Sequence, residues 1–128
     1  MNRVSVLDCT LRDGGYVNDF NFSSRTIKTM ISKLGKAHID IIECGFIRDT
    51  EYDRERSVFS RIEQITPFIT PKKKHSMYVG MIVTGTISAS KISPRTKDSI
   101  DGIRITFHKK EIDEAFSLGY ALMDKGYE

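Results

Sequence analysis

The chain has 128 residues, 39% hydrophobic and 29% charged, and its 20 Lys and Arg against 17 Asp and Glu give a net charge of +3 at pH 7. This composition excludes collagenous, coiled-coil and disulfide-scaffold proteins and is typical of a globular domain. We expect one domain, residues 1–128, which is well short of the roughly 250 residues of a complete (β/α)8 barrel.

The first half of the chain alternates strand and helix patterns. Residues 4–9 predict a short strand, and Ser23-Ser24 caps an amphipathic helix that follows it. The apolar positions of this helix are Ile27, Met30, Ile31 and Leu34. Residues 39–45 predict a second strand. A second helix is then predicted, ended by Thr66-Pro67, from the spacing of Val58, Phe59, Ile62 and Ile65.

The second half repeats this alternation. Residues 75–83 predict a third strand, and the polar, proline-interrupted residues 84–101 predict only a short helix. Residues 102–107 predict a fourth strand, followed by a closing helix that Gly126 caps. One apolar face of that helix is formed by Ile112, Ala115, Phe116, Gly119, Leu122 and Met123. Strands that alternate with helices indicate right-handed crossovers and a parallel sheet, so the predicted class is α/β.

The patterns of apolar, basic and cysteine residues exclude membrane and nucleic-acid partners and indicate the cellular compartment. The longest apolar run, residues 77–83, is far shorter than the roughly 18 residues of a membrane-spanning helix, so we expect no membrane contact. The N-terminus lacks a secretory apolar stretch, which favours a cytoplasmic protein. The basic run at residues 72–74 has no interleaved aromatics, so we expect no nucleic-acid partner. Cys9 and Cys44 lie in apolar strands, where free buried thiols are expected.

The stretch after the first strand carries an acid, an Arg-Asp pair and two glycines. Alternation places Asp8, Thr10 and Arg12 on one face, and Asp13 precedes a Gly-Gly turn. Ligands in parallel α/β folds bind at the carboxyl ends of the strands. The stretch therefore predicts either a binding site or a surface ion pair beside a tight turn.

Glu43 interrupts the second apolar strand. A carboxylate in such surroundings costs several kcal/mol unless it is paired, and Arg12 at a matching height is the nearest cation. Such a pair would hold the guanidinium of Arg12 ready for a substrate oxygen, or would simply join two strands.

The fourth strand carries polar residues on one face. Arg104, Thr106 and His108 share that face by alternation, which predicts substrate contacts inside a barrel near its open end. The alternative is a local ion pair for Arg104 and a solvent-exposed His108. Acidic and basic residues are interspersed from Arg48 to Arg56, which is typical of a solvated loop.

Two motifs together, Leu11-Arg12-Asp13-Gly14 and Ile42-Glu43-Cys44-Gly45, give a resemblance to the N-terminal part of the DRE-TIM metallolyase superfamily. This group includes hydroxymethylglutaryl-CoA lyase, isopropylmalate synthase, 4-hydroxy-2-oxovalerate aldolase and pyruvate carboxyltransferase-like proteins. The resemblance implies that the chain is the (βα)4 half of a TIM barrel. It implies a metal-dependent aldolase, lyase or acyltransferase that acts through the enolate of a 2-oxo acid or acyl-CoA.

The resemblance also implies roles for residues. Asp13 would bind a divalent metal (Mn, Mg, Co or Zn), Arg12 would stabilise the enolate oxygen, and Glu43 would hold Arg12. Tyr16 stands where these aldolases usually have a histidine, so Tyr16 with a water is the candidate for proton transfer. The family's His-x-His metal ligands are missing from the sequence. We therefore expect part of a longer protein or a truncated gene product, with no tightly bound metal and no activity of its own.

Two alternatives remain open from the sequence. The chain is either half of an enzyme or a noncatalytic interaction module, and a half-barrel of either kind would expose two sheet edges and form a homodimer. A complete flavodoxin-like domain is weakened because no Gly-rich phosphate loop opens the first helix.

Overall fold

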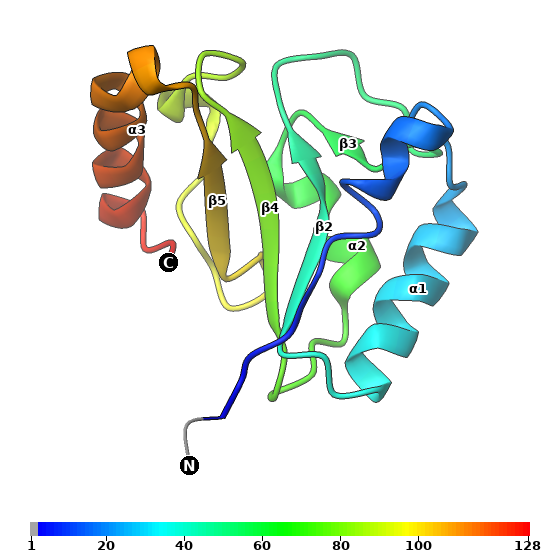
Figure 1. The fold of residues 1–128 in the computed structure, drawn as a ribbon. Coiled ribbons are helices and arrows are strands. Elements are labelled where there is room, and N and C mark those ends of the chain that lie inside the picture. The colour runs from blue at the N-terminus through cyan, green and yellow to red at the C-terminus, as the bar shows by residue number, and fades with distance from the viewer. Residues whose placement is uncertain (1–2) are drawn as a thin grey trace.

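The structure is a computed structural model that describes residues 3–128. Four strands form a parallel sheet in the order β1-β2-β4-β5, and β3 pairs in parallel with β2 off this path. The strands are β1 (Leu7–Asp8), β2 (Ile41–Ile47), β3 (Val58–Phe59), β4 (Met77–Val83) and β5 (Gly102–Thr106). Figure 1 shows β2, β4 and β5 side by side with their carboxyl ends at the top. The predicted α/β class with a parallel sheet is confirmed, and its arrangement is consistent with half of a TIM barrel.

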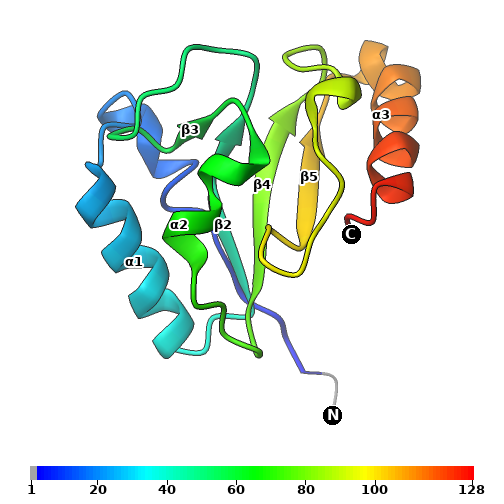
Figure 2. The same cartoon turned by 180° about the vertical axis from the view of Figure 1, so that it is seen from behind.

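Three helices cover one face of this sheet. They are α1 (Ser24–Lys36), α2 (Thr66–Ile69) and α3 (Ile112–Asp124), and seen from behind, α2 crosses in front of the strands (Figure 2). The Ser23 side chain caps α1 by accepting a hydrogen bond from the backbone N–H of Thr26. No helix within residues 3–128 is long and apolar enough to cross a membrane.

The main core lies between this helical layer and one side of the strands. It joins Ile31 of α1 and Leu122 of α3 to Ile42, Tyr78 and Ile82 of the central strands. Because side chains alternate along a strand, the intervening residues project to the other face of the sheet. That second face carries the charged side chains of the candidate site.

A bulge in β2 changes which residues share that second face. The pairing of β2 with β4 shifts register between Glu43 and Phe46. Gly45 has a φ of +152°, and a Cβ at Gly45 would lie 2.1 Å from the Ser57 carbonyl oxygen, so only glycine fits there. The extra residue places Phe46 on the same face as Glu43, in a small cluster with Phe20, Val58 and Met81.

The structure corrects the prediction of a second helix. Val58 and Phe59 form β3, because Phe46 and Ile47 offer them a parallel strand partner. A 3-10 turn (Ile62–Gln64) and the short α2 follow, and Pro67 lies in the first turn of α2 instead of ending a helix. The short helix expected in residues 84–101 is a 3-10 turn, Ala89–Lys91.

The closing helix is present, but its buried face differs from the prediction. Ala115 and Leu122 are buried as expected, together with Leu118, which the predicted face omitted. Phe116 and Met123 are 59% and 65% exposed, because within residues 3–128 the sheet ends at β5 and no further strand lies beneath that side of α3. Gly126 follows the helix with a φ of +91°, as expected of a cap.

Candidate functional site

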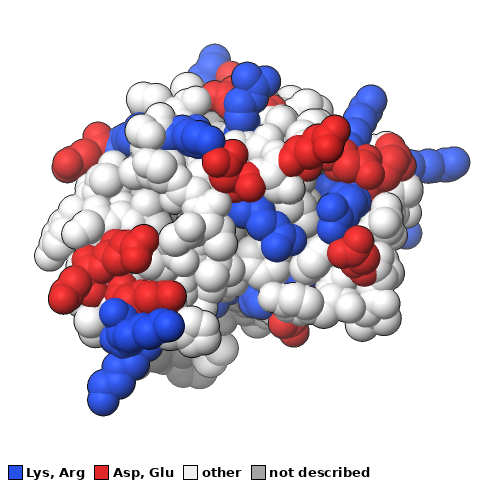
Figure 3. Space-filling model, turned by 90° about the horizontal axis from the view of Figure 1, so that it is seen from above, with Lys and Arg blue, Asp and Glu red and all other residues white. Residues whose placement is uncertain are grey.

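The candidate site lies at the carboxyl ends of the strands. After β1 the chain turns sharply, because the backbone N–H groups of Arg12 and Asp13 both donate to the Cys9 carbonyl oxygen at 3.1 and 2.7 Å. A 3-10 turn, Gly14–Val17, follows. Figure 3 views this end of the molecule and shows basic and acidic side chains interspersed across it.

Glu43 is the centre of the site. Its carboxylate is fully buried, and its two oxygens accept from two different arginines: Oε1 from Arg12 Nε and Oε2 from Arg104 Nη1, each at 2.6 Å. The predicted pair of Glu43 with Arg12 is therefore present. Arg104, 61 residues away from Glu43 in the sequence, completes a bridge across β2, β4 and β5.

Glu43 stabilises the charged form of Arg12. Burial lowers the pKa of the Arg12 guanidinium, but the hydrogen bond and the charge of Glu43 outweigh burial, so the pKa lies above its ordinary value. The Arg12 side chain is 16% exposed and that of Arg104 is 42% exposed. The cluster therefore presents a fixed cation that remains within reach of solvent, as stabilisation of a developing oxyanion requires.

Asp13 does not form a metal site with the other described residues. Its carboxylate is 66% exposed and pairs with Arg12 Nη1 at 3.1 Å. Within residues 3–128 no group of three or more His, Cys, Asp or Glu side chains could hold a metal ion. A divalent metal needs several oxygen ligands, whereas Asp13 supplies one carboxylate that is already paired with Arg12, so the described residues do not fit a metal. The role of Asp13 as a metal ligand stays a prediction.

Tyr16 is near the charged cluster. It is 67% exposed, and its ring packs edge-on against Phe20 at 5.3 Å and Phe46 at 6.1 Å between centroids. The Arg12 guanidinium carbon lies 5.8 Å from the centre of the same Phe46 ring. Phe46 therefore joins Tyr16 to Arg12, which is the arrangement that a shared site needs.

The remaining predicted contacts are exposed. The Thr10 hydroxyl donates to Asp8 Oδ2 at 3.0 Å. Thr106 ends β5. His108 precedes a 3-10 turn, Lys109–Glu111, and its backbone N–H donates to Glu111 Oε2 at 2.8 Å. No ion pair of the His108 ring is found within residues 3–128, so the structure brings Thr10, Thr106 and His108 to the carboxyl end without joining them to Glu43.

Two cysteines take no part in the cluster. Both cysteines are free thiols, as predicted. Cys44 is buried, which was also predicted, whereas Cys9 is only half-buried. Burial raises the pKa of the Cys44 thiol well above its ordinary value, so this sulfur stays protonated and is a poor nucleophile.

The sequence reading missed Arg48. The charge pattern placed it in a solvated loop, but its guanidinium carbon lies 5.5 Å from the centre of the Phe20 ring and 5.2 Å from that of Phe46. Its place directly after β2 was the one available signal, because residues at that end of a parallel strand line the binding edge.

Comparison with known proteins supports the fold. No family model and no curated protein matches the sequence. Among solved structures, the chain is similar to the N-terminal domain of a putative aldolase from Bacteroides vulgatus, with a TM-score of 0.68 and 22% identity. The similarity covers 98% of this chain and 42% of that chain, so the chain spans less than half the length of the solved domain. The chain thus shares the parallel α/β fold of this putative aldolase domain.

Proposed function

We propose that the chain is the first half of an aldolase-like barrel enzyme that makes or breaks a carbon–carbon bond through an enolate. The substrate would be a 2-oxo acid or an acyl-CoA. The observation that carries this proposal is the buried Glu43 carboxylate, which holds Arg12 and Arg104 at the carboxyl ends of the strands. The fold shared with an aldolase domain is consistent with it.

The chemistry assigns one task to each group. In cleavage of a 4-hydroxy-2-oxo acid, the 4-hydroxyl loses its proton and the C3–C4 bond breaks. The electron pair of that bond moves onto the 2-oxo oxygen, and protonation of C3 then yields pyruvate and an aldehyde. Arg12 would stabilise the enolate oxygen, because a fixed charge in a partly buried site lowers the energy of a developing anion. Tyr16, acting with a water, is the proposed proton carrier.

The test is Arg12→Ala in the protein as its gene encodes it, assayed for pyruvate release from 4-hydroxy-2-oxo acids with divalent metals varied. We expect kcat to fall about 100-fold or more, since one preorganised donor is worth a few kcal/mol. Arg54→Ala removes an exposed arginine and is the matched control. If Arg12→Ala lowers stability but leaves turnover intact, the pair with Glu43 is structural only.

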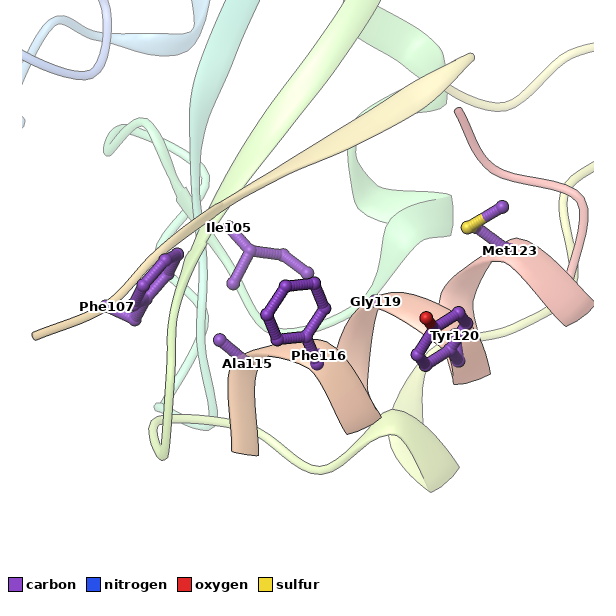
Figure 4. Close-up of a pocket in the computed structure, with 7 residues that line it drawn as sticks. All are labelled: Ile105, Phe107, Ala115, Phe116, Gly119, Tyr120 and Met123. Carbon is purple, nitrogen blue, oxygen red and sulfur yellow. The ribbon is translucent and has the colours of Figure 1, made fainter. Parts of the chain in front are cut away.

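We also propose a second, noncatalytic candidate function: a half-barrel that binds another copy of itself. The specific observation is an apolar groove of about 390 Å³ between β5 and α3. Figure 4 shows Phe107 on the β5 side and Phe116, Tyr120 and Met123 along α3. These four side chains are 45–65% exposed, although each is large and apolar or aromatic.

The edges of the sheet favour a second copy as the occupant. Among the described residues, β5 has a strand neighbour on one side only. On its other side the backbone of Glu128 forms hydrogen bonds with Asp101 and Ile103, at the start of the strand, and the rest of that edge is open within residues 3–128. At the opposite edge, Val4 and Val6 beside β1 are 81% and 51% exposed. A two-fold axis along the barrel would bring this apolar edge of one copy, in parallel, against β5 of the other.

Sedimentation velocity tests this pairing. Phe116→Ser should convert a dimer into a monomer, whereas Val17→Ser, which changes an apolar residue that is 92% exposed and outside the groove, should leave the dimer intact. A wild-type chain that stays monomeric at high concentration contradicts the homodimer.

A further inference from the structure

Arg48 is held by aromatic rings and not by a carboxylate. Its guanidinium lies within cation–π distance of both Phe20 and Phe46, which are 5% and 4% exposed and therefore fixed in place. Among the described residues 3–128, its side chain has no ion pair and no hydrogen bond. Its N–H donors are therefore oriented by packing and remain available to an anion.

The acidic residues adjacent in the sequence to Arg48 and to Phe20 are already paired with other cations. Asp49, the next residue in the chain, pairs with Lys91. Asp19, beside Phe20, pairs with Arg56 at 2.9 Å. Both of these carboxylates thus have a cation of their own, and within residues 3–128 neither forms an ion pair with Arg48 at the carboxyl end of β2.

Arg48 and Arg12 lie over the same ring. Their guanidinium carbons are 5.2 and 5.8 Å from the centre of the Phe46 ring. Both guanidinium groups therefore border one aromatic side chain at the carboxyl end of the sheet, where ligands of parallel α/β folds bind. Arg12 has two carboxylates as partners, Glu43 and Asp13, whereas Arg48 has neither.

We propose that Arg48 binds the carboxylate of the 2-oxo acid and leaves Arg12 for the neighbouring 2-oxo oxygen. This inference rests on the proposed enolate chemistry and names the residue that selects an acid over a neutral ketone. A planar guanidinium matches a carboxylate with two parallel hydrogen bonds, and the two Phe rings reduce the entropy lost when those bonds form. The bulge at Gly45 is what makes this arrangement possible, because it brings Phe46 to the face of Glu43.

The experiment compares pyruvate with methyl pyruvate, a neutral ester that keeps the 2-oxo group. Both are titrated into the protein as its gene encodes it and followed by the backbone amide NMR signals of residues 10–16 and 43–48. Wild type should bind pyruvate about tenfold or more tightly than the ester, since hydrogen bonds to a charged group are the stronger kind.

Variants locate the charge responsible. Arg48→Met keeps an unbranched chain against the rings and should abolish the preference for pyruvate, while Arg48→Lys should restore part of it. Arg54→Met, the matched control, removes an equal charge from an exposed loop position and should keep the full preference. Melting temperatures of the variants, measured in parallel, separate loss of binding from loss of folding.

The outcomes distinguish this inference from the function on which it rests. A preference for pyruvate that survives in Arg48→Met but disappears in Arg12→Ala overturns the role of Arg48 and leaves the enolate site standing. Equal, weak binding of both compounds by wild type overturns both proposals. Loss of the preference in Arg54→Met as well shows a general charge effect and also overturns the role of Arg48.

Discussion

Glu43→Gln tests the centre of the site, because it changes one oxygen of a fully buried carboxylate into an amide and keeps its shape. The Gln oxygen can still accept from one arginine, but its NH2 group must face the donors of the other. Two cations also lose their shared counter-charge. The expected effect is therefore a loss of stability without a change in volume.

The magnitude follows from the burial of the partners. Removing one member of a buried ion pair costs about 3–5 kcal/mol of stability. Because Arg104 is 42% exposed, water screens its interaction with Glu43 and reduces the contribution of that pair. We therefore expect Glu43→Gln to lower the free energy of unfolding by about 2–4 kcal/mol. For a domain of this size that corresponds to a fall in melting temperature of roughly 10 °C.

Circular dichroism during thermal and urea unfolding measures this loss. Asp19→Asn is the matched control: it also converts a paired carboxylate to an amide, but Asp19 is 77% exposed and its pair with Arg56 should contribute less than about 1 kcal/mol. If Glu43→Gln proves no more destabilising than Asp19→Asn, the Glu43 carboxylate is not the fixed centre of the cluster and does not orient Arg12.

Three further predictions concern other parts of the chain. Titration of the 128-residue chain with Mn²⁺ should reveal no micromolar site, since residues 3–128 contain no group of three or more side chains that could hold a metal with Asp13; such a site, if lost in Asp13→Asn, would show that the ligand set has been misjudged. Gly45→Ala should lower the urea midpoint by an amount equivalent to about 3 kcal/mol or more, because its methyl group would collide with the Ser57 carbonyl oxygen; an unchanged midpoint would refute the bulge geometry. Burial raises the pKa of Tyr78, so its contribution to stability is complete below the unfolded pKa of about 10 and is lost as pH rises through the higher folded pKa. Tyr78→Phe should therefore lose less stability than wild type as pH rises above about 10, measured by urea unfolding at a series of pH values.

The sequence by itself determined the class of the fold. Apolar runs bounded by turn residues predict the strands, and helical spacing predicts α1 and α3, because burial on a strand or helix face follows from local periodicity. The pair of Arg12 with Glu43 was also predictable, since a carboxylate inside an apolar strand requires a cation and Arg12 follows the neighbouring strand at a matching height.

Tertiary structure decided which pattern applied where periodicity was ambiguous. The spacing of Val58 and Phe59 fits a helix, but in the folded chain these residues pair with the end of β2 as a strand. This pairing depends on contacts between segments that are distant in the sequence. In α3, spacing identified apolar residues but could not show that Phe116 and Met123 would lie beyond the last strand.

The composition of the site was also decided in three dimensions. Arg104 reaches Glu43 across β4, and Arg48 reaches the Phe46 ring because a one-residue bulge changes the side to which that ring points. Local sequence fixes how side chains alternate along a strand. Register, bulges and the proximity of distant strands depend on the packed sheet as a whole, so they determine which charges share one carboxylate and which remain free for a ligand.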